Sequence, residues 1–219
     1  MKIPAALLFD MDGLLLDTER VIMETFLEIL TPFDVNTETA TEFFYGLVGS
    51  SSDESKRQLL TFLPSGLPYD DFAKEWHVNY GAKMAKDVPI KPYVSECLKL
   101  LTGQGHRMAV VTSTKGDQAR HHLTVAGLID HFEMVTGGDE VSANKPEPAP
   151  YLETAEALGV SASDCFAFED SDRGITAAIR AGCRAVQIPD LRPANKPLPD
   201  LGQLVAADFK QAMRDLQVL

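Results

Sequence analysis

Short apolar runs alternate with helical patterns through the C-terminal two-thirds of the chain. The apolar runs are Ala5–Phe9, Met108–Val111, Phe132–Val135, Cys165–Phe168 and Ala185–Ile188. Segments with helical spacing lie between them and begin near Pro92, Ala149 and Asp172. Strands that alternate with helices in this way build a parallel sheet with helices packed on both of its faces. The pattern therefore predicts an α/β core.

Residues 20–86 have a different pattern, in which helical segments follow one another without a convincing strand. The expected helices are one around Ile22–Leu30 and others at Thr37–Phe44, Ser55–Phe62 and Tyr69–Met84. Because this block interrupts the chain directly after the first strand, it predicts a helical unit inserted over the end of the sheet. We therefore expect an α/β core from residues 1–17 and 88–219, and a helical cap domain from residues 18–87.

The net charge of the chain disfavours some kinds of binding partner. A net charge of −12 over 219 residues disfavours nucleic acids and anionic membrane surfaces, whose partners need clustered Lys and Arg. A small anionic substrate remains compatible, since a local metal ion and one lysine can outweigh distant surface charge. No apolar run approaches the ~18–20 residues that span a bilayer.

The cysteines and the N-terminal stretch indicate the cellular compartment in which the protein is expected. Cys97, Cys165 and Cys183 are widely spaced and form no Cys-x-x-Cys pair, which argues against a disulfide framework and a zinc site. The first apolar stretch reaches Asp10 too soon for a signal peptide. We expect a cytoplasmic protein with buried, reduced cysteines, and a monomer as the default state.

An acidic tract, Asp10-Met11-Asp12-Gly13, follows the first apolar run. Ligands of an α/β sheet bind beyond the carboxyl ends of its strands, so these acids lie where chemistry is expected. Two acids one residue apart repel each other unless a cation lies between them, and a hard dication with oxygen ligands is the usual solution. Taken alone, the tract fits a turn or a fragment of a calcium-binding loop equally well.

Three further segments carry polar groups at or beyond the ends of predicted strands or before a helix. Thr112 and the backbone after it can hold a phosphate oxygen, although a plain helix N-cap is the alternative. Lys145, fixed before a proline, can neutralise phosphate charge, whereas a solvated surface lysine is the default. Glu169 and Asp170 can complete a metal site, with helix capping as the simpler interpretation.

The order of these segments resembles the haloacid dehalogenase-like superfamily. The Asp10–Glu19 tract is similar to the first motif of that family and Thr112 to its second. Lys145 is similar to the third motif, and Glu169 with Asp170 to the fourth. The resemblance covers essentially the whole chain and is greatest to small sugar-phosphate and nucleoside-phosphate phosphatases near β-phosphoglucomutase. It implies a Rossmann-like core with an inserted α-helical cap.

The resemblance also implies a reaction, the hydrolysis of small phosphate monoesters. Asp10 would attack phosphorus and form an aspartyl-phosphate. Asp12 would protonate the leaving alkoxide and then activate water as a general base. Thr112, the backbone of Ser113 and Lys145 would balance charge on the transferring phosphoryl group.

The family's cofactor and specificity elements follow from the same resemblance. Mg²⁺ would be held by Asp10, the backbone carbonyl of Asp12 and Asp170, with Glu169 as a further contributor. The cap would supply substrate specificity. The cap residues expected to contribute are Glu19, Ser50 and Ser51.

Three other functions are compatible with this fold. Dehalogenases of the superfamily lack the second aspartate of the first motif, so Asp12 argues against dehalogenation. Phosphomutases carry a cap arginine and a histidine after the first motif, whereas Gly49–Glu54 contains no arginine and Ile22 occupies the histidine position. A non-catalytic binding or regulatory protein is the third alternative, and the intact set of catalytic positions disfavours it.

Overall fold

The computed structural model describes residues 4–48, 52–193 and 195–218. Contacts divide the chain into two compact units. The first comprises residues up to Asp17, then Val88–Asp190, and the residues from Leu198 onward. The second comprises Thr18–Asp87 and Leu191–Pro197.

A parallel sheet forms the centre of the first unit. Its strands are β1 (Ala6–Phe9), β2 (Met108–Val111), β3 (Met134–Thr136), β4 (Cys165–Glu169), β5 (Arg184–Gln187) and β6 (Leu204–Val205). In the described chain they lie in the order β3-β2-β1-β4-β5-β6, and every neighbouring pair is parallel. Phe9 pairs with both Val110 and Phe168, so β1, β2 and β4 end at the same edge of the sheet.

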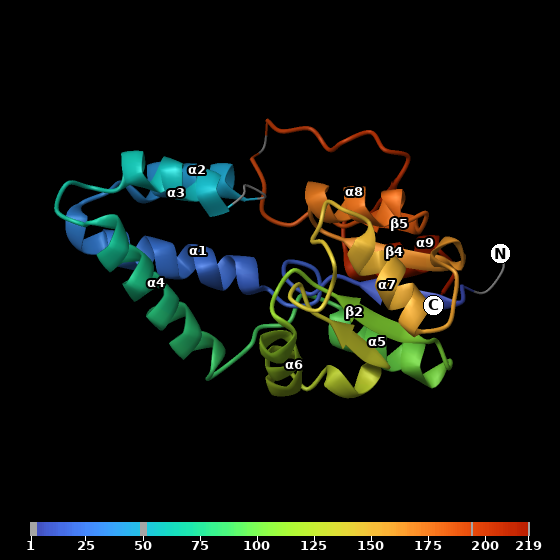
Figure 1. The fold of residues 1–219 in the computed structure, drawn as a ribbon. Helices are drawn as coiled ribbons and strands as arrows, with labels where there is room; N and C mark the ends of the chain where they lie inside the picture. The colour runs from blue at the N-terminus through green and yellow to red at the C-terminus, as the bar shows by residue number, and fades with distance from the viewer. Residues whose placement is uncertain (1–3, 49–51, 194, 219) are drawn as a thin grey trace. The chain divides into compact units, whose positions relative to one another are not determined.

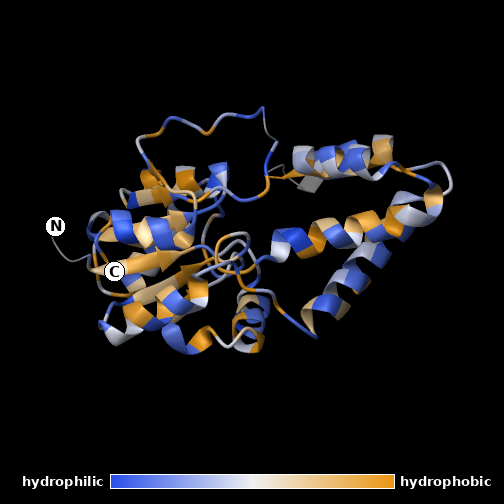
Figure 2. Cartoon of the chain, turned by 180° about the vertical axis from the view of Figure 1, so that it is seen from behind, coloured by the Kyte–Doolittle hydropathy of each residue, from blue (hydrophilic) through white to orange (hydrophobic). Residues whose placement is uncertain are grey.

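Helices cover both faces of this sheet (Figure 1). They are α5 (Val94–Gly103), α6 (Gly116–Val125), α7 (Ala149–Ala157), α8 (Asp172–Arg180) and α9 (Phe209–Asp215). On one face, apolar side chains such as Leu8 and Ala167 form a buried cluster with residues of α7 and α8. On the other face, the ring of Phe9 lies 5.6 Å from that of Phe209 in α9. Burial on both faces explains why β1 and β2 are continuous apolar runs (Figure 2).

The predicted α/β fold is confirmed, with differences at two strands. The run at Phe132–Val135 was expected to be a strand, but β3 begins only at Met134, because a short 3-10 helix at Ile129–His131 precedes it. The strand β6 was not predicted. Leu204 and Val205 are both about half exposed, so this edge strand lacks the buried apolar run that marks the others.

The second unit is helical and has its own apolar core. It contains α1 (Thr18–Leu30), a 3-10 turn at Thr31–Phe33, α2 (Thr37–Leu47), α3 (Ser52–Phe62) and α4 (Tyr69–Met84). Phe26 of α1 lies at the centre of an aromatic cluster, with its ring 5.9 Å from Phe72 and 5.7 Å from Trp76. The indole of Trp76 also donates a hydrogen bond of 3.0 Å to the carbonyl of Ile22, which joins α4 to α1.

The expected bounds of the two domains stay a prediction, and one segment of the chain groups differently by its contacts. Leu191–Pro197 was expected to belong to the α/β core, yet it groups with the helical unit. Its physical basis is Leu191, which packs against the apolar cluster of that unit. That the helical unit acts as a cap stays a prediction.

Two further expectations concern the cysteines and membranes. Cys97, Cys165 and Cys183 are all buried and free, as predicted. None of the helices in the described part of the chain is both long and apolar enough to span a bilayer.

Candidate active site

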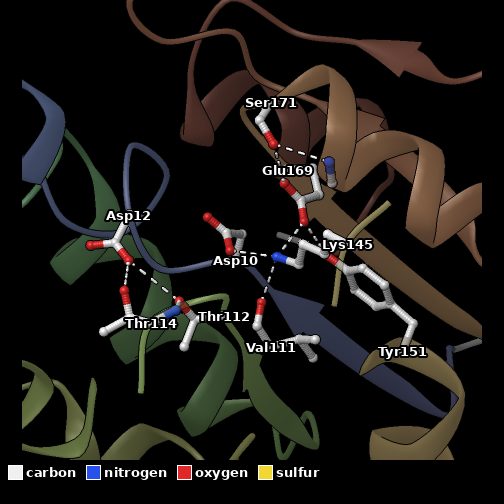
Figure 3. Close-up of polar contacts among 10 residues, drawn as sticks. Asp10, Asp12, Val111, Thr112, Thr114, Lys145, Tyr151, Glu169 and Ser171 are labelled. Carbon is white, nitrogen blue, oxygen red and sulfur yellow. Dashed lines mark hydrogen bonds and ion pairs between the residues drawn. The ribbon is translucent and has the colours of Figure 1, made fainter. Parts of the chain in front are cut away.

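The carboxyl ends of three adjacent strands bring the predicted polar groups together. Asp10 directly follows β1, Thr112 follows β2, and Glu169 is the last residue of β4. Because β1 pairs in parallel with both neighbours, these residues lie at one edge of the sheet. Figure 3 shows their side chains converging there with Lys145, which precedes α7.

Lys145 is the centre of this arrangement. Its Nζ lies 2.5 Å from Asp10 Oδ1 and 2.6 Å from Glu169 Oε1. It also donates a hydrogen bond of 2.8 Å to the carbonyl of Val111 (Figure 3). An ammonium group has three N–H donors, so all of them point at protein oxygens. Lys145 is 5% exposed, which excludes the default interpretation of a solvated surface lysine.

Glu169 is fully buried and held by hydrogen bonds. Tyr151 Oη donates to Glu169 Oε1 at 2.5 Å, and Ser171 Oγ donates to Oε2 at 3.4 Å. A Cβ atom at Gly174 would lie 1.9 Å from Glu169 Oε2. The first turn of α8 can therefore approach this carboxylate only because position 174 is glycine.

Asp12 faces a different set of groups. Thr114 Oγ1 donates to Asp12 Oδ2 at 2.7 Å, and Thr112 Oγ1 donates to the same oxygen at 3.3 Å (Figure 3). The turn that carries Asp12 depends on Gly13, which has a positive φ of 78° and donates its N–H to the carbonyl of Leu16. The two aspartates of the first motif thus point to different partners.

The buried cluster carries more negative charge than its lysine neutralises. Burial raises the pKa of Asp10 to about 8, and the charges of Glu169 and Asp12 add to the effect while Lys145 opposes it. Burial alone would lower the pKa of Lys145, but its contacts with Asp10 and Glu169 outweigh burial and raise that pKa above the ordinary value. The lysine therefore stays an ammonium ion beside carboxylates that still lack a full counter-charge.

A divalent metal fits this excess of negative charge. Asp10, Glu169 and Asp170 each offer a carboxylate oxygen, and the three oxygens lie within 4.8 Å of one another. The set is composed of oxygen donors alone, which suits a hard cation such as Mg²⁺. Asp12 is not one of these three residues, and its Oδ2 accepts hydrogen bonds from Thr112 and Thr114.

The remaining predicted site residues lie elsewhere or cannot be placed. Ser113 is exposed in the loop after β2. Glu19 lies in the first turn of α1, in the helical unit. Ser50 and Ser51 fall outside the described residues, and so does the first half of the stretch in which a mutase arginine was sought.

Two residues of the site were not predicted from the sequence. Thr114 contacts Asp12, and Tyr151 contacts Glu169. A second hydroxyl two positions after Thr112 was a signal that could have identified Thr114. The apolar ring of Tyr151 suits a core position of α7, so nothing in its local pattern indicates the role of its hydroxyl.

Comparisons with known proteins agree with this geometry. Residues 7–188 match the haloacid dehalogenase-like hydrolase family. Protein CbbY of Rhodobacter capsulatus is 30% identical over 213 residues, which cover 90% of this chain and 93% of that protein. Fructose-1-phosphate phosphatase YqaB of Escherichia coli is 30% identical over 184 residues, which cover 84% of this chain and 96% of that protein.

A solved structure extends the similarity to three dimensions. A haloacid dehalogenase (HAD) family hydrolase from Deinococcus radiodurans, with bound phosphate and sodium, has a TM-score of 0.80 and 25% identity. The match covers 100% of this chain and 99% of that one. The chain therefore belongs to the haloacid dehalogenase-like hydrolases, and within that family it is a phosphoric monoester hydrolase.

Proposed function

We propose that this enzyme is a Mg²⁺-dependent phosphatase that hydrolyses small phosphate esters of sugars or nucleosides through an aspartyl-phosphate on Asp10. The observation that carries the proposal is the buried carboxylate of Asp10, held 2.5 Å from Lys145 Nζ at the end of the central strand. Two similar proteins point to the substrate class, since one is named a fructose-1-phosphate phosphatase and another a phosphorylated carbohydrates phosphatase.

The first half of the reaction uses Asp10 as nucleophile. A carboxylate oxygen of Asp10 attacks phosphorus, and the bond between phosphorus and the ester oxygen breaks. Lys145 holds the carboxylate in one orientation, because it binds Asp10 Oδ1 and is itself anchored by Glu169 and the carbonyl of Val111. The hydroxyl of Thr112 and the backbone of Ser113 are proposed to bind oxygens of the transferring group.

Asp12 is proposed to move the protons. In its protonated form it gives a proton to the leaving ester oxygen, so the first product leaves as an alcohol. The resulting carboxylate then takes a proton from the water that attacks the aspartyl-phosphate, and inorganic phosphate is released. Each turnover returns Asp12 to its protonated form.

The proposed metal ligands are Asp10, Glu169, Asp170 and the backbone carbonyl of Asp12. When bound there, Mg²⁺ would supply positive charge against the carboxylates and the phosphate oxygens. The helical unit, with Glu19, is proposed to select among substrates and to exclude bulk water. A mutase is less favoured, since Ile22 packs its apolar side chain against the core of the helical unit. The cytoplasmic location stays a prediction.

Metal dependence tests the proposal directly. Chelation with EDTA is expected to abolish hydrolysis of a panel of sugar, nucleoside and aryl phosphates, and added Mg²⁺ should restore it. Ca²⁺ should inhibit, because it prefers more ligands at longer distances and would shift Asp10 away from the line of attack. Initial rates at a fixed concentration of free metal provide the measurement. Turnover that resists EDTA, or full activity in Ca²⁺, contradicts the assigned metal role.

Asp12→Asn tests the acid–base assignment. The variant should lose about 10²–10⁴-fold in turnover of sugar phosphates, the range that general acid–base catalysis contributes. The loss in the first step should be smaller for an aryl phosphate, whose leaving group needs no proton. Single-turnover rates on the two ester classes measure this difference. Equal losses would show that Asp12 is not the acid.

A further inference from the structure

We propose that Thr114 is a positioning residue for Asp12, whose carboxylate it holds in the orientation that proton transfer to the leaving oxygen requires. The inference rests on the proposed function, because it takes Asp12 as the acid and base of the reaction. Thr114 is not expected to touch the substrate. Its effect would pass entirely through the hydrogen bond to Asp12 (Figure 3).

The two hydroxyls on Asp12 are not equivalent. The distance of 2.7 Å from Thr114 Oγ1 to Asp12 Oδ2 is at the optimum for a bond between a hydroxyl and an oxygen. The distance of 3.3 Å from Thr112 Oγ1 lies beyond the usual range. Thr112 Oγ1 also accepts a hydrogen bond of 3.1 Å from the N–H of Thr114. Of these two hydroxyls, that of Thr114 is therefore the stronger donor to Asp12.

Both backbone polar groups of Thr114 are hydrogen-bonded, which fixes the loop at this residue. Its N–H bonds to Thr112 Oγ1, and its carbonyl accepts a hydrogen bond of 2.9 Å from the N–H of Gly138. A Cβ atom at Gly138 would lie 2.3 Å from the carbonyl oxygen of Ser113, so this approach requires glycine. A β-branched side chain on a fixed backbone has few rotamers. The hydroxyl of Thr114 thus occupies a defined position.

Asp12, which accepts this hydrogen bond, lies in a turn whose backbone is also fixed by hydrogen bonds. Gly13 donates its N–H to the carbonyl of Leu16 at 2.9 Å, and Leu16 donates its own to the carbonyl of Met11 at 3.0 Å. With the backbone on either side of Asp12 held in this way, its remaining freedom is rotation of the side chain. A short hydrogen bond to Oδ2 restricts that rotation, and it thereby sets the direction of the whole carboxyl group.

Orientation of the acid matters most when the leaving oxygen is strongly basic. An alkoxide must receive the proton of Asp12 while the bond between phosphorus and oxygen breaks, whereas p-nitrophenolate leaves without one. Misplacing a catalytic group lowers the rate of the step that uses it. Loss of the Thr114 hydroxyl should therefore slow alkyl phosphates more than p-nitrophenyl phosphate.

Direct binding of phosphate by Thr114 is the competing role, and it predicts a different pattern. In that case every ester would be affected alike, since all of them carry the same phosphoryl group. Inhibition by inorganic phosphate would weaken as well.

The experiment compares Thr114→Val, which keeps the side-chain shape, with Thr114→Ser, which keeps the hydroxyl, in the full-length enzyme with Mg²⁺. Turnover and KM are measured for p-nitrophenyl phosphate and for alkyl phosphates, together with the inhibition constant of inorganic phosphate. We expect Thr114→Val to lose at least about 10-fold more turnover on alkyl phosphates than on the aryl ester, within the span of acid–base effects. The phosphate inhibition constant should stay within about twofold, and Thr114→Ser should recover most of the activity on alkyl phosphates.

Thr124→Val is the matched control. Its exposed hydroxyl donates a hydrogen bond of 2.7 Å to the carbonyl of Arg120 within α6. This variant should leave both ester classes unchanged. If the melting curve of Thr114→Val shows that this variant does not fold, Thr114→Ala replaces it in the same assays.

Three results would overturn the inference: equal losses on both ester classes, weaker inhibition by phosphate, or a serine variant no better than the valine. Its failure can be told from that of the proposed function through Asp12→Asn. If Asp12→Asn discriminates between the ester classes and Thr114→Val does not, only the positioning role is wrong. If Asp12→Asn itself fails to discriminate, the acid–base assignment is wrong and the inference falls with it.

Discussion

Asp10→Asn is expected to abolish phosphatase activity and, at the same time, to raise the melting temperature of the metal-free protein at pH 8. Turnover should fall by at least about 10³-fold, because an amide is not a nucleophile toward phosphorus. The gain in stability has a separate cause. Asp10 is a buried carboxyl group whose pKa is raised from 3.8 to about 8, chiefly by burial.

The direction of the pH dependence follows from proton linkage. Between the unfolded pKa and the folded one, the folded protein binds more protons at Asp10 than the unfolded chain does. The free energy of unfolding therefore falls as pH rises from about 4 to about 8, the window that the raised pKa defines. Asparagine carries no charge, so this decrease in the free energy of unfolding does not occur in the variant. The advantage of the variant should be largest near pH 8 and should vanish near pH 4.

Thermal unfolding in EDTA from pH 4 to pH 8 measures this difference. A gain of about 1 kcal/mol at pH 8 would correspond to roughly 2–4 °C at this chain length. With Mg²⁺ present the difference should shrink, because the metal stabilises the carboxylate and binds the amide less well. The prediction fails if the variant melts below the wild type at pH 8, or if it keeps activity within tenfold of it.

The strands and the order of the motifs could be predicted because each depends on local pattern. A strand buried on both faces must be an apolar run, and Cys165–Phe168 within β4 is one. The same reasoning could not find Leu204–Val205, which is short and exposed at the sheet edge. It also could not assign Leu191–Pro197 to the helical unit, since Leu191 packs against residues far away in the sequence.

The side-chain contacts of the site could be predicted only in part. Parallel topology was enough to place Asp10, Thr112 and Glu169 at one edge, because their strands are neighbours. The topology gave no information on which oxygen each hydrogen-bond donor would bind. That Lys145 directs all of its N–H groups to protein oxygens, and that Tyr151 shares Glu169 with it, depends on three-dimensional packing.

Lys145→Met is expected to depress every substrate alike and to destabilise the protein by about 3–5 kcal/mol, the usual result of removing one partner from a buried ion pair. The variant leaves the buried carboxylates of Asp10 and Glu169 without their shared cation. An ammonium whose pKa is raised by folding stabilises fully below its ordinary value of 10.5, and this contribution is lost as pH rises through the folded pKa. Denaturant unfolding at pH 7 therefore measures the full contribution of the Lys145 ammonium to stability.

Lys83→Met is the matched control, since Lys83 pairs with Glu28 at 2.8 Å on the surface, where such pairs contribute about 0–1 kcal/mol. The double variant Asp10→Asn/Lys145→Met separates charge balance from catalysis. Asp10→Asn should stabilise the Lys145→Met background by more than it stabilises the wild type, because it removes one of the two carboxylates left without a cation, whereas activity should remain absent. If the double variant is destabilised by the sum of the two single effects, the contact between Asp10 and Lys145 carries no coupling energy. In that case the lysine does not hold the nucleophile in place.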